Sequence, residues 1–324
     1  MTSQDVEVSV HSGGHTLRGT LTLPDGDPTM PAALLLPGSG PVDRDSNHKR
    51  LPLGITADLA RGLADAGVAS LRYDKRGVGA STGSWRTAGL HDNVADAAAV
   101  LAALRSRPEV DAAQVFLVGH SEGATLAAAV AADDDELAGV VLLSAAATPG
   151  EQLLLWQAGQ IAPSLPRPVR ALLRLLRVDL QTKVAQNHAK IKATTTDEAR
   201  IGLAKVNARW SREFLAHDPR LDLARISAPV LALTGTKDLQ VDPADLDTIK
   251  ALVPAPVETR AMPDVTHVLR AQSGPPSLSR YKQEVRSPVD PQVIRAVTEW
   301  VVRHTHLPHQ GSSSTPDDDA TRGS

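Results

Sequence analysis

The chain lacks cysteine and is poor in aromatic residues. None of its 324 residues is Cys, and only four are Trp, two Tyr and two Phe. Disulfides, thiolate metal sites and cysteine nucleophiles are therefore excluded. This absence does not indicate a compartment, because a chain without cysteine is stable in any redox environment. The hydrophobic content of 42% comes mainly from Ala, Leu and Val, which predicts an aliphatic core.

Long basic runs and long apolar runs are also missing. The formal net charge is −3, so the chain has no electrostatic footprint for nucleic acid or for an anionic membrane surface. No stretch approaches the roughly 18 consecutive apolar residues that a membrane span needs, and the first residues do not resemble a secretory signal. We therefore expect a cytoplasmic protein that acts on a small molecule, with no nucleic-acid partner and no membrane span; the oligomeric state is not indicated.

Short apolar runs alternate with helical patterns along most of the chain. An antiparallel hairpin is expected from strands 6–11 and 16–23. Further strands are expected at 32–36, 67–73, 114–119, 138–144, 229–235 and 256–262. Helices are expected at 52–66, 91–106, 122–132, 243–252 and 290–303. This alternation predicts an α/β fold with a mostly parallel, doubly wound sheet behind the N-terminal hairpin.

The alternation stops between residues 147 and 226, where apolar residues recur at helical spacing and no clear strand is visible. We expect a helical cap over 147–226, inserted into a core of residues 1–146 and 227–306. Residues 307–324 are polar and rich in Pro, Gly and Ser, which predicts a disordered tail.

Two features of these segments have alternative interpretations. The basic stretch PRPVRALLRLLR (166–177) has the pattern of a membrane-surface helix, but the solvated face of a packed cap helix is the favoured interpretation. His304, His306 and His309 lie close together without carboxylate or thiol neighbours, so a solvated tail is preferred to a metal site.

The stretch VGHSEGATLAAAV (118–130) places Ser121 between Gly119 and Gly123. The pattern G-x-S-x-G arises by chance in about one chain in ten of this length. Here, however, a predicted strand runs directly into it and a predicted helix follows without a linker. Such a turn exposes the serine at the carboxyl end of the sheet and directs the free N–H groups of the helix toward it. Ser121 is therefore the candidate nucleophile.

A serine hydroxyl needs a histidine to take its proton and a carboxylate to orient that histidine. Asp238 and His267 each follow directly after a predicted strand, in the order serine, aspartate, histidine that α/β-hydrolases use. Asp264 is too close to His267 in the chain, and Asp242 precedes a proline and is typical of an N-cap. The rival histidines are less well placed: His11, His15, His48, His91, His120, His188 and His217.

The loop after the strand at 32–36 is rich in glycine and proline. We expect the backbone N–H groups of Ser39 and Glu122 to form an oxyanion hole, although a plain Gly/Pro turn explains the loop alone equally well.

Arg44 is expected to join neighbouring charges in a network that braces the loop; a substrate carboxylate bound by Arg44 is the weaker alternative. The members of this network would be Asp43, Arg44, Asp45, Asp74, Lys75 and Arg76.

These stretches resemble the α/β-hydrolase superfamily, and more narrowly bacterial carboxylesterases and serine-aminopeptidase-like hydrolases with a G-S-G-P-x-D-R-D oxyanion loop. The matching stretches are GSGPVDRD (38–45), YDKRGVGAS (73–81), VGHSEGA (118–124), TGTKDLQV (234–241) and DVTHVLR (264–270). The resemblance spans roughly residues 5–303, and it implies a Ser-His-Asp triad beneath a variable helical cap. The histidine that often precedes the oxyanion glycines is Pro37 here, so the hole is expected to rely on GSGP.

The leading hypothesis is a serine hydrolase that cleaves carboxylic esters with small or medium acyl groups through an acyl-enzyme, with no metal or cofactor. The first alternative is an aminopeptidase or amidase with the same triad, which needs an acidic group in the cap to bind a free amine; Glu151, Asp179 and Asp197 are candidates. The second alternative is a ligand-binding protein that keeps only the fold.

Overall fold

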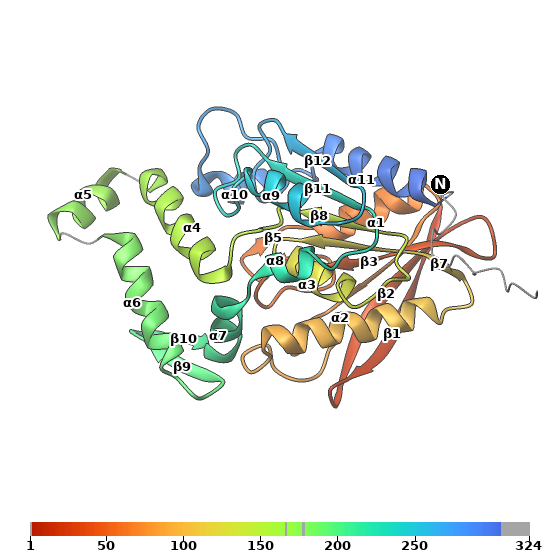
Figure 1. The fold of residues 1–324 in the computed structure, drawn as a ribbon, viewed down its shortest axis with the longest axis horizontal. Coiled ribbons are helices and arrows are strands. Elements are labelled where there is room, and N and C mark those ends of the chain that lie inside the picture. The colour runs from red at the N-terminus through yellow and green to blue at the C-terminus, as the bar shows by residue number, and fades with distance from the viewer. Residues whose placement is uncertain (1, 166, 177–178, 306–324) are drawn as a thin grey trace, which may run out of the picture.

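The computed structural model describes residues 2–165, 167–176 and 179–305 (Figure 1). The expected tail at 307–324 lies outside the described residues, as do His306 and His309. Among the described helices, none is both long and apolar enough to cross a membrane.

An eight-stranded sheet forms the centre of the molecule. In spatial order its strands are β1 (Ser3–Ser12), β2 (His15–Pro24), β6 (Ala69–Tyr73), β3 (Met30–Leu36), β7 (Val110–His120), β8 (Gly139–Leu143), β11 (Val230–Gly235) and β12 (Val257–Met262). The pairs β1–β2 and β2–β6 are antiparallel, and all pairs from β6 to β12 are parallel. The predicted fold class is confirmed, including the hairpin at one edge.

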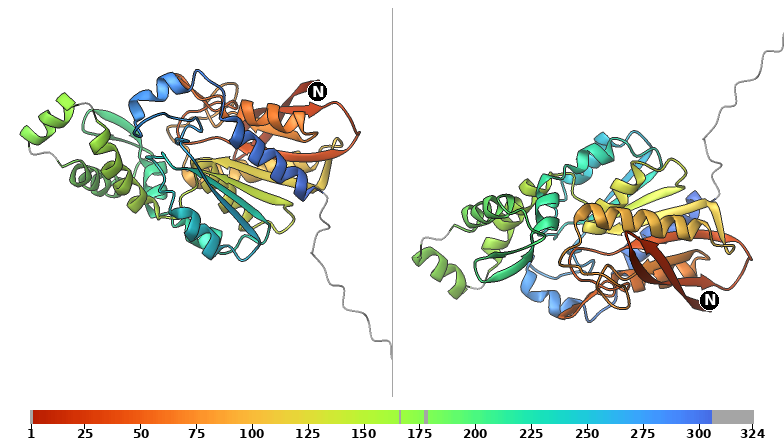
Figure 2. Two further views of the ribbon diagram at one scale, coloured as in Figure 1. Left: turned by 90° about the horizontal axis from the view of Figure 1, so that it is seen from above. Right: turned by 90° about the horizontal axis from the view of Figure 1, so that it is seen from below.

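Helices cover both faces of this sheet (Figure 2). On one face lie α1 (Ile55–Asp65) and α11 (Pro291–His304). On the other lie α2 (Leu90–Arg105), α3 (Glu122–Ala131) and α9 (Asp245–Leu252). The central strands are apolar throughout because alternate residues face opposite layers. In β7, Val115 and Leu117 join one buried cluster, and Phe116 and Val118 join the other.

Most of the segment 147–226 projects beyond the carboxyl ends of the parallel strands (Figure 1), but Pro219–Leu223 near its end pack against α3 and α9. Its elements are α4 (Gly150–Ser164), α5 (Arg167–Leu175), α6 (Leu180–Lys192), β9 (Glu198–Ile201), β10 (Ala204–Asn207), α7 (Ala208–Ala216) and α8 (Pro219–Leu223). We keep the name cap segment for residues 147–226.

The expectation that the cap segment contains no strand is wrong. β9 and β10 pair as an antiparallel hairpin across Gly202, whose φ of 63° is a left-handed conformation that suits glycine. Apolar residues recur at every second position on each side of Gly202, at 199 and 201 and again at 204 and 206, which is the spacing of strands and was overlooked in the sequence. A helix begins only at Ala208, after Asn207 accepts a hydrogen bond from the N–H of Trp210.

Helix α5 differs from the packed cap helix that the sequence favoured. It lies at the far tip of the cap segment (Figure 1). Leu172 is 53% exposed and Leu175 is 80% exposed. The sequence favoured a packed helix here, because an amphipathic pattern does not reveal whether a neighbour exists.

Four short elements lie near the carboxyl ends of the parallel strands. They are β4 (Asn47–His48), β5 (Leu51–Pro52), the 3₁₀ turn at Leu278–Arg280 and α10 (Tyr281–Glu284). Because Pro52 pairs with Asn47, the helix expected from residue 52 begins at Ile55.

The turn from β7 into α3 brings three backbone segments unusually close together. A Cβ atom on Gly119 would lie 2.1 Å from the carbonyl oxygen of Gly123. A Cβ atom on Gly123 would lie 2.0 Å from the carbonyl oxygen of Leu36, at the end of β3. Only residues without a side chain fit at both positions, so these glycines fix the position of the helix against the sheet.

Gly123→Ala is expected to destabilise the protein, although glycine-to-alanine changes inside helices are favourable by about 1 kcal/mol in general. The added methyl group meets backbone that cannot move aside, so we expect a loss of about 3 kcal/mol or more. Urea unfolding measures this change. Ala124→Gly, at the next helical position, is the control and should cost about 1 kcal/mol. A Gly123→Ala protein as stable as the wild type would contradict the contact.

Candidate active site

Ser121 lies at the turn between β7 and α3, where the two glycine contacts force an unusual backbone conformation. Its φ of 58° and ψ of −120° cost about 1–3 kcal/mol for a residue with a side chain. The N–H of Ser121 donates to the carbonyl of Leu143 at 2.9 Å, which ties the turn to β8. The turn therefore projects the serine side chain beyond the carboxyl ends of the strands, where open α/β sheets bind ligands.

The structure brings Ser121, His267 and Asp238 into one hydrogen-bonded chain. Ser121 Oγ lies 3.0 Å from His267 Nε2. On the other side of the ring, His267 Nδ1 lies 2.8 Å from Asp238 Oδ2 and 3.1 Å from Oδ1. His267 follows β12 and Asp238 follows β11, so residues distant in sequence meet because their strands end at the same edge.

Asp238 is held as a carboxylate. Its side chain is fully buried, which by itself raises the pKa of the carboxyl. The His267 ring and the backbone N–H groups of Gln240 and Val241, 2.7 and 3.0 Å from Oδ1, outweigh burial. The net result is a pKa below the ordinary value of an aspartate, so the group is an ionised acceptor for the His267 N–H at neutral pH.

His120 lies directly before Ser121 and contacts the backbone of His267. Its Nε2 donates to the carbonyl oxygen of His267 at 2.8 Å, and the two rings are 5.1 Å apart between centroids. Burial, together with the neighbouring His267 ring, lowers the pKa of His120 from 6.5 to about 3. The ring is therefore neutral at working pH.

Ser121 opens into a cavity of about 100 Å³ between the sheet and the cap segment. Ser39 and Glu122 also line this cavity, and a Cβ on Gly38 would lie 3.6 Å from that of Ser121. Glu122 is the first residue of α3, so its N–H has no acceptor within the helix. The two N–H groups predicted to form an oxyanion hole thus belong to residues that line the cavity of the candidate nucleophile.

A second, larger cavity of about 330 Å³ adjoins the first, because Ser39 and Trp210 line both. Its wall contains Trp85, three cationic side chains and two asparagines. The polar and charged residues concerned are Lys75, Arg76, Asn93, Lys205 and Asn207.

Arg44 is held away from the two cavities. Its guanidinium pairs with Asp74 at 2.9 Å and with Glu7 of β1 at 2.8 Å, and its backbone N–H donates to Asp74. Burial alone would lower the pKa of Arg44, but the two carboxylates raise it above the ordinary range. Arg44 thus braces the loop after β3 through Asp74, a predicted partner, and through Glu7, which was not predicted, and these contacts disfavour the alternative that it binds a substrate carboxylate.

Lys75 and Arg76 have separate partners. Arg76 makes two hydrogen bonds of 2.8 Å to Asp96 of α2. Lys75 instead reaches the loop after β3 and the start of α3, where it contacts Gly38 and Glu122.

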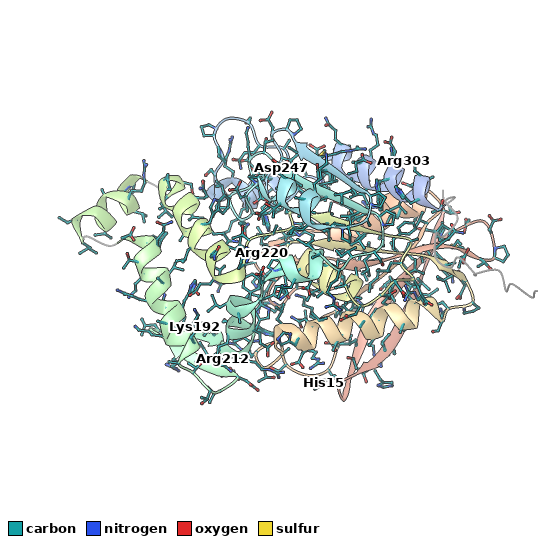
Figure 3. All side chains as sticks on the ribbon, in the orientation of Figure 1. His15, Lys192, Arg212, Arg220, Asp247 and Arg303 are labelled. Atoms are coloured by element: carbon teal, nitrogen blue, oxygen red, sulfur yellow. The ribbon has the colours of Figure 1, made fainter. Side chains whose placement is uncertain are left out.

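The rival carboxylates at the site have other partners. Asp264 is exposed and pairs with Lys237 at 2.7 Å, and Asp242 accepts from the N–H of Ala244, just before α9. In the cap segment, Glu151 pairs with Lys192. Figure 3 labels Lys192 on α6. Asp179 caps α6 through the N–H of Thr182. Neither Glu151 nor Asp179 lines either cavity, and Asp197 does not either.

The sequence did not identify the residues that shape the cavities. Trp85 comes from a loop before α2, and Trp210 and Phe214 come from α7. Their rarity was the only available signal: three of the few aromatic residues in the chain meet here. Ser144, at the end of β8, lines the Ser121 cavity with a φ of 49° and also carried no motif.

In the part of the chain that the structure describes, no group of three or more His, Asp or Glu side chains is arranged to hold a metal ion. His304 is within this part, and its Nδ1 contacts the carbonyl of Trp300 at 2.8 Å.

Residues 53–272, more than half of the chain, match a family model described as "Serine aminopeptidase, S33". The chain belongs to this family. A curated relative, the esterase EstD of Thermotoga maritima, is 27% identical over 293 residues. The match covers 89% of this chain and 66% of EstD, so the chain spans just under two thirds of the length of that relative.

Solved structures with the same fold include proteins with different printed activities. Est1E from Butyrivibrio proteoclasticus, bound to ferulic acid, has a TM-score of 0.63 at 18% identity, over 92% of this chain and 98% of that one. Proline iminopeptidase from Mycobacterium smegmatis has a TM-score of 0.60 at 17% identity, over 93% of this chain and 99% of that one. At these identities the likeness bears on the fold, and it confirms the predicted α/β-hydrolase architecture.

The lowered pKa of His120 predicts a pH-dependent stability. The unfolded chain protonates this histidine below about pH 6.5, whereas the folded protein does so only near pH 3, so stability falls as the pH falls between these values. From pH 7 to pH 5 the loss from this group is about 2 kcal/mol. His120→Gln keeps an N–H donor for His267 but does not titrate, so its stability should fall by about 2 kcal/mol less.

Urea unfolding at the two pH values measures the difference. His11→Gln, which changes an exposed histidine, is the matched control and should keep the wild-type pH dependence. Equal losses in the wild type and His120→Gln would show that His120 is not held neutral.

Proposed function

We propose that the protein hydrolyses carboxylic esters of small molecules, with Ser121 as the nucleophile. The observation that carries the proposal is the hydrogen-bonded chain from Asp238 through His267 to Ser121, which ends at a strained turn opening into a cavity. This arrangement has the geometry that nucleophilic catalysis by serine requires.

In the first half of the reaction, Ser121 Oγ attacks the ester carbonyl carbon and its proton passes to His267 Nε2. Asp238 holds the ring with Nδ1 protonated and stabilises the imidazolium that forms. The N–H groups of Ser39 and Glu122 receive the negative charge that develops on the carbonyl oxygen. When the carbon–oxygen bond breaks, His267 returns the proton to the departing alcohol and leaves an acyl group on Ser121.

In the second half, water attacks the acyl group and gives its proton to His267. The tetrahedral intermediate collapses, the proton moves to Ser121 Oγ, and the carboxylic acid is released. Every proton is accounted for by side chains of the site, so this proposal requires no metal or cofactor.

The segment 147–226 contributes the upper wall of the site in this proposal, over a core of residues 1–146 and 227–306. Leu153, Gln157, Trp210 and Phe214 from the cap segment line the same cavity as Ser121. Gln157 donates to the carbonyl of Gln240, two residues beyond Asp238, which links the cap segment to the core beside the site. Substrate size is then set by residues of the cap segment.

The larger cavity suits the bulkier portion of an ester. Trp85 and Trp210 offer flat apolar surface there, which favours planar or aromatic groups. Lys75, Arg76 and Lys205 also line this cavity, and each is paired with a carboxylate, so they add N–H groups to its wall rather than net positive charge. The ferulic acid bound to the structural neighbour Est1E is such an aromatic compound, and this supports the proposal.

The acidic residues of the two cavity walls argue against the aminopeptidase alternative, although the family description names that activity. A free amine is cationic at neutral pH and needs an unpaired carboxylate. Glu122 is the one acidic residue among those that line the two cavities, and it is already paired with Lys75 at 2.8 Å. The name of the relative EstD also supports the cleavage of esters.

A substrate panel with Ser121→Ala tests the proposal. The wild type is expected to hydrolyse p-nitrophenyl esters with kcat/KM at least about 100-fold above that for aminoacyl anilides. Ser121→Ala should lower ester hydrolysis by about 10⁴-fold or more and abolish labelling by a fluorophosphonate. Hydrolysis of anilides alone would favour the aminopeptidase. A folded wild-type protein that never labels would favour a non-catalytic binding protein.

Asp238→Asn tests the proposed role of the carboxylate. The amide is nearly isosteric but is neutral, so His267 loses the acceptor that fixes its tautomer. We expect kcat to fall by about 10²–10⁴-fold with a much smaller change in KM. Asp264→Asn, which changes the exposed rival carboxylate, is the matched control and should keep wild-type kcat. The reverse pattern would assign the acid to Asp264.

A further inference from the structure

A buried lysine joins the two backbone positions proposed to stabilise the oxyanion. Lys75 follows β6, and its side chain is 5% exposed. Its Nζ donates to the carbonyl oxygen of Gly38 at 2.7 Å and to Oε1 of Glu122 at 2.8 Å. We propose that Lys75 is a positioning residue that orients the oxyanion hole, an inference that rests on the proposed ester hydrolysis.

The contact with Gly38 acts through a single peptide group. The carbonyl of Gly38 and the N–H of Ser39 belong to the same planar unit, and the described chain contains no cis peptide bond. In a trans peptide these two groups point in opposite directions. Holding the carbonyl oxygen against Lys75 therefore fixes the direction of the Ser39 N–H. A cation at the oxygen also polarises the peptide, which strengthens its N–H as a donor.

The contact with Glu122 acts on the second donor. The Glu122 side chain is 2% exposed, and its Oε1 also accepts from Nδ2 of Asn93 at 3.1 Å. This anchors the first residue of α3, the one whose N–H is the other proposed donor. Lys75 thus binds the carbonyl next to one N–H and the side chain of the residue that carries the other.

The loop that carries Lys75 is firmly held, so the lysine is a fixed anchor. Asp74 accepts from the N–H groups of Arg44 and Ala80 at 2.8 and 3.1 Å. Ser81 Oγ donates to the carbonyl of Asp74 at 2.7 Å, and the N–H of Val78 donates to the carbonyl of Lys75 at 3.0 Å. Because β6, β3 and β7 are neighbours in the sheet, Lys75 reaches across the end of β3 to the helix that follows β7.

A buried ion pair is a poor way to gain stability alone, since well-packed apolar side chains serve as well or better. An ion pair that fixes the direction of backbone groups has a different role, because its loss lowers the reaction rate more than it lowers the stability of the fold. Removing Lys75 leaves the Glu122 carboxylate buried without a cation, so Lys75→Met is expected to be destabilised. Lys75→Met/Glu122→Gln removes both charges and is expected to fold.

The test measures kcat and KM for p-nitrophenyl acetate, a substrate with a small acyl group, and inhibition by trifluoroacetone. That ketone forms an oxyanionic adduct with a nucleophilic serine, so its affinity depends on the oxyanion hole. For Lys75→Met/Glu122→Gln we expect kcat to fall about 10–100-fold with KM changed less than about threefold. The affinity for trifluoroacetone should fall by a similar factor.

Arg105→Met/Asp134→Asn is the matched control. It removes another partly buried ion pair, between the last turn of α2 and the loop after α3, away from the cavities. This control should keep wild-type kcat and affinity for trifluoroacetone. Melting temperatures check that each variant is folded.

Wild-type kcat and wild-type trifluoroacetone affinity in a folded variant that lacks Lys75 would overturn the inference. A change in KM alone would do the same. Should neither Lys75 variant fold, Glu122→Gln decides, because it loosens the hold on Lys75 and an unchanged kcat would contradict the role. Failure of the proposed function is distinguishable: then the wild type does not cleave esters, or Ser121→Ala still does.

Discussion

The close approach of backbone to backbone where β7 meets α3 is the constraint on which the rest of the site depends. No side chain fits at Gly119 or Gly123, so the first turn of α3 lies directly against the ends of β7 and β3. Ser121 is left in a conformation that side chains rarely adopt, and the packed sheet bears that strain. The position of the serine is therefore set by these backbone contacts alone. Its partners meet it because the neighbouring strands end at the same edge of the sheet.

Around this turn, buried charges connect loops rather than fill the core. Arg44 joins the loop after β3 to Asp74, and Arg76 joins the loop after β6 to Asp96 in α2. Each is neutralised by a carboxylate at hydrogen-bonding distance, so none is an uncompensated ion. Such pairs contribute little net stability, but they fix the orientation of the groups they join, which apolar contacts do not. The strand ends consequently form one rigid rim around the proposed oxyanion position.

The features that depend on the order of the strands could be predicted from the sequence. Ser121, Asp238 and His267 each follow an apolar run, and parallel strands end together, so their meeting could be foreseen. The hairpin at β9 and β10 was missed, because its two strands have only four residues each and lie between segments with helical spacing, which hid their alternation around Gly202. The wall of the cavities was also hidden, since Trp85 and Trp210 come from a loop and from the cap segment. One of the two partners of Lys75 is the carbonyl oxygen of Gly38, and no residue type signals a backbone partner.

The contact of His120 with the carbonyl of His267 has a mechanical consequence. His120 and Ser121 are covalent neighbours, so the loop of the proposed base is fastened to the loop of the proposed nucleophile twice, once through each ring. Two hydrogen bonds restrict the displacement of one loop relative to the other more than one bond does. The distance between Ser121 Oγ and His267 Nε2 is therefore held in part by a contact that takes no part in the proposed proton transfer.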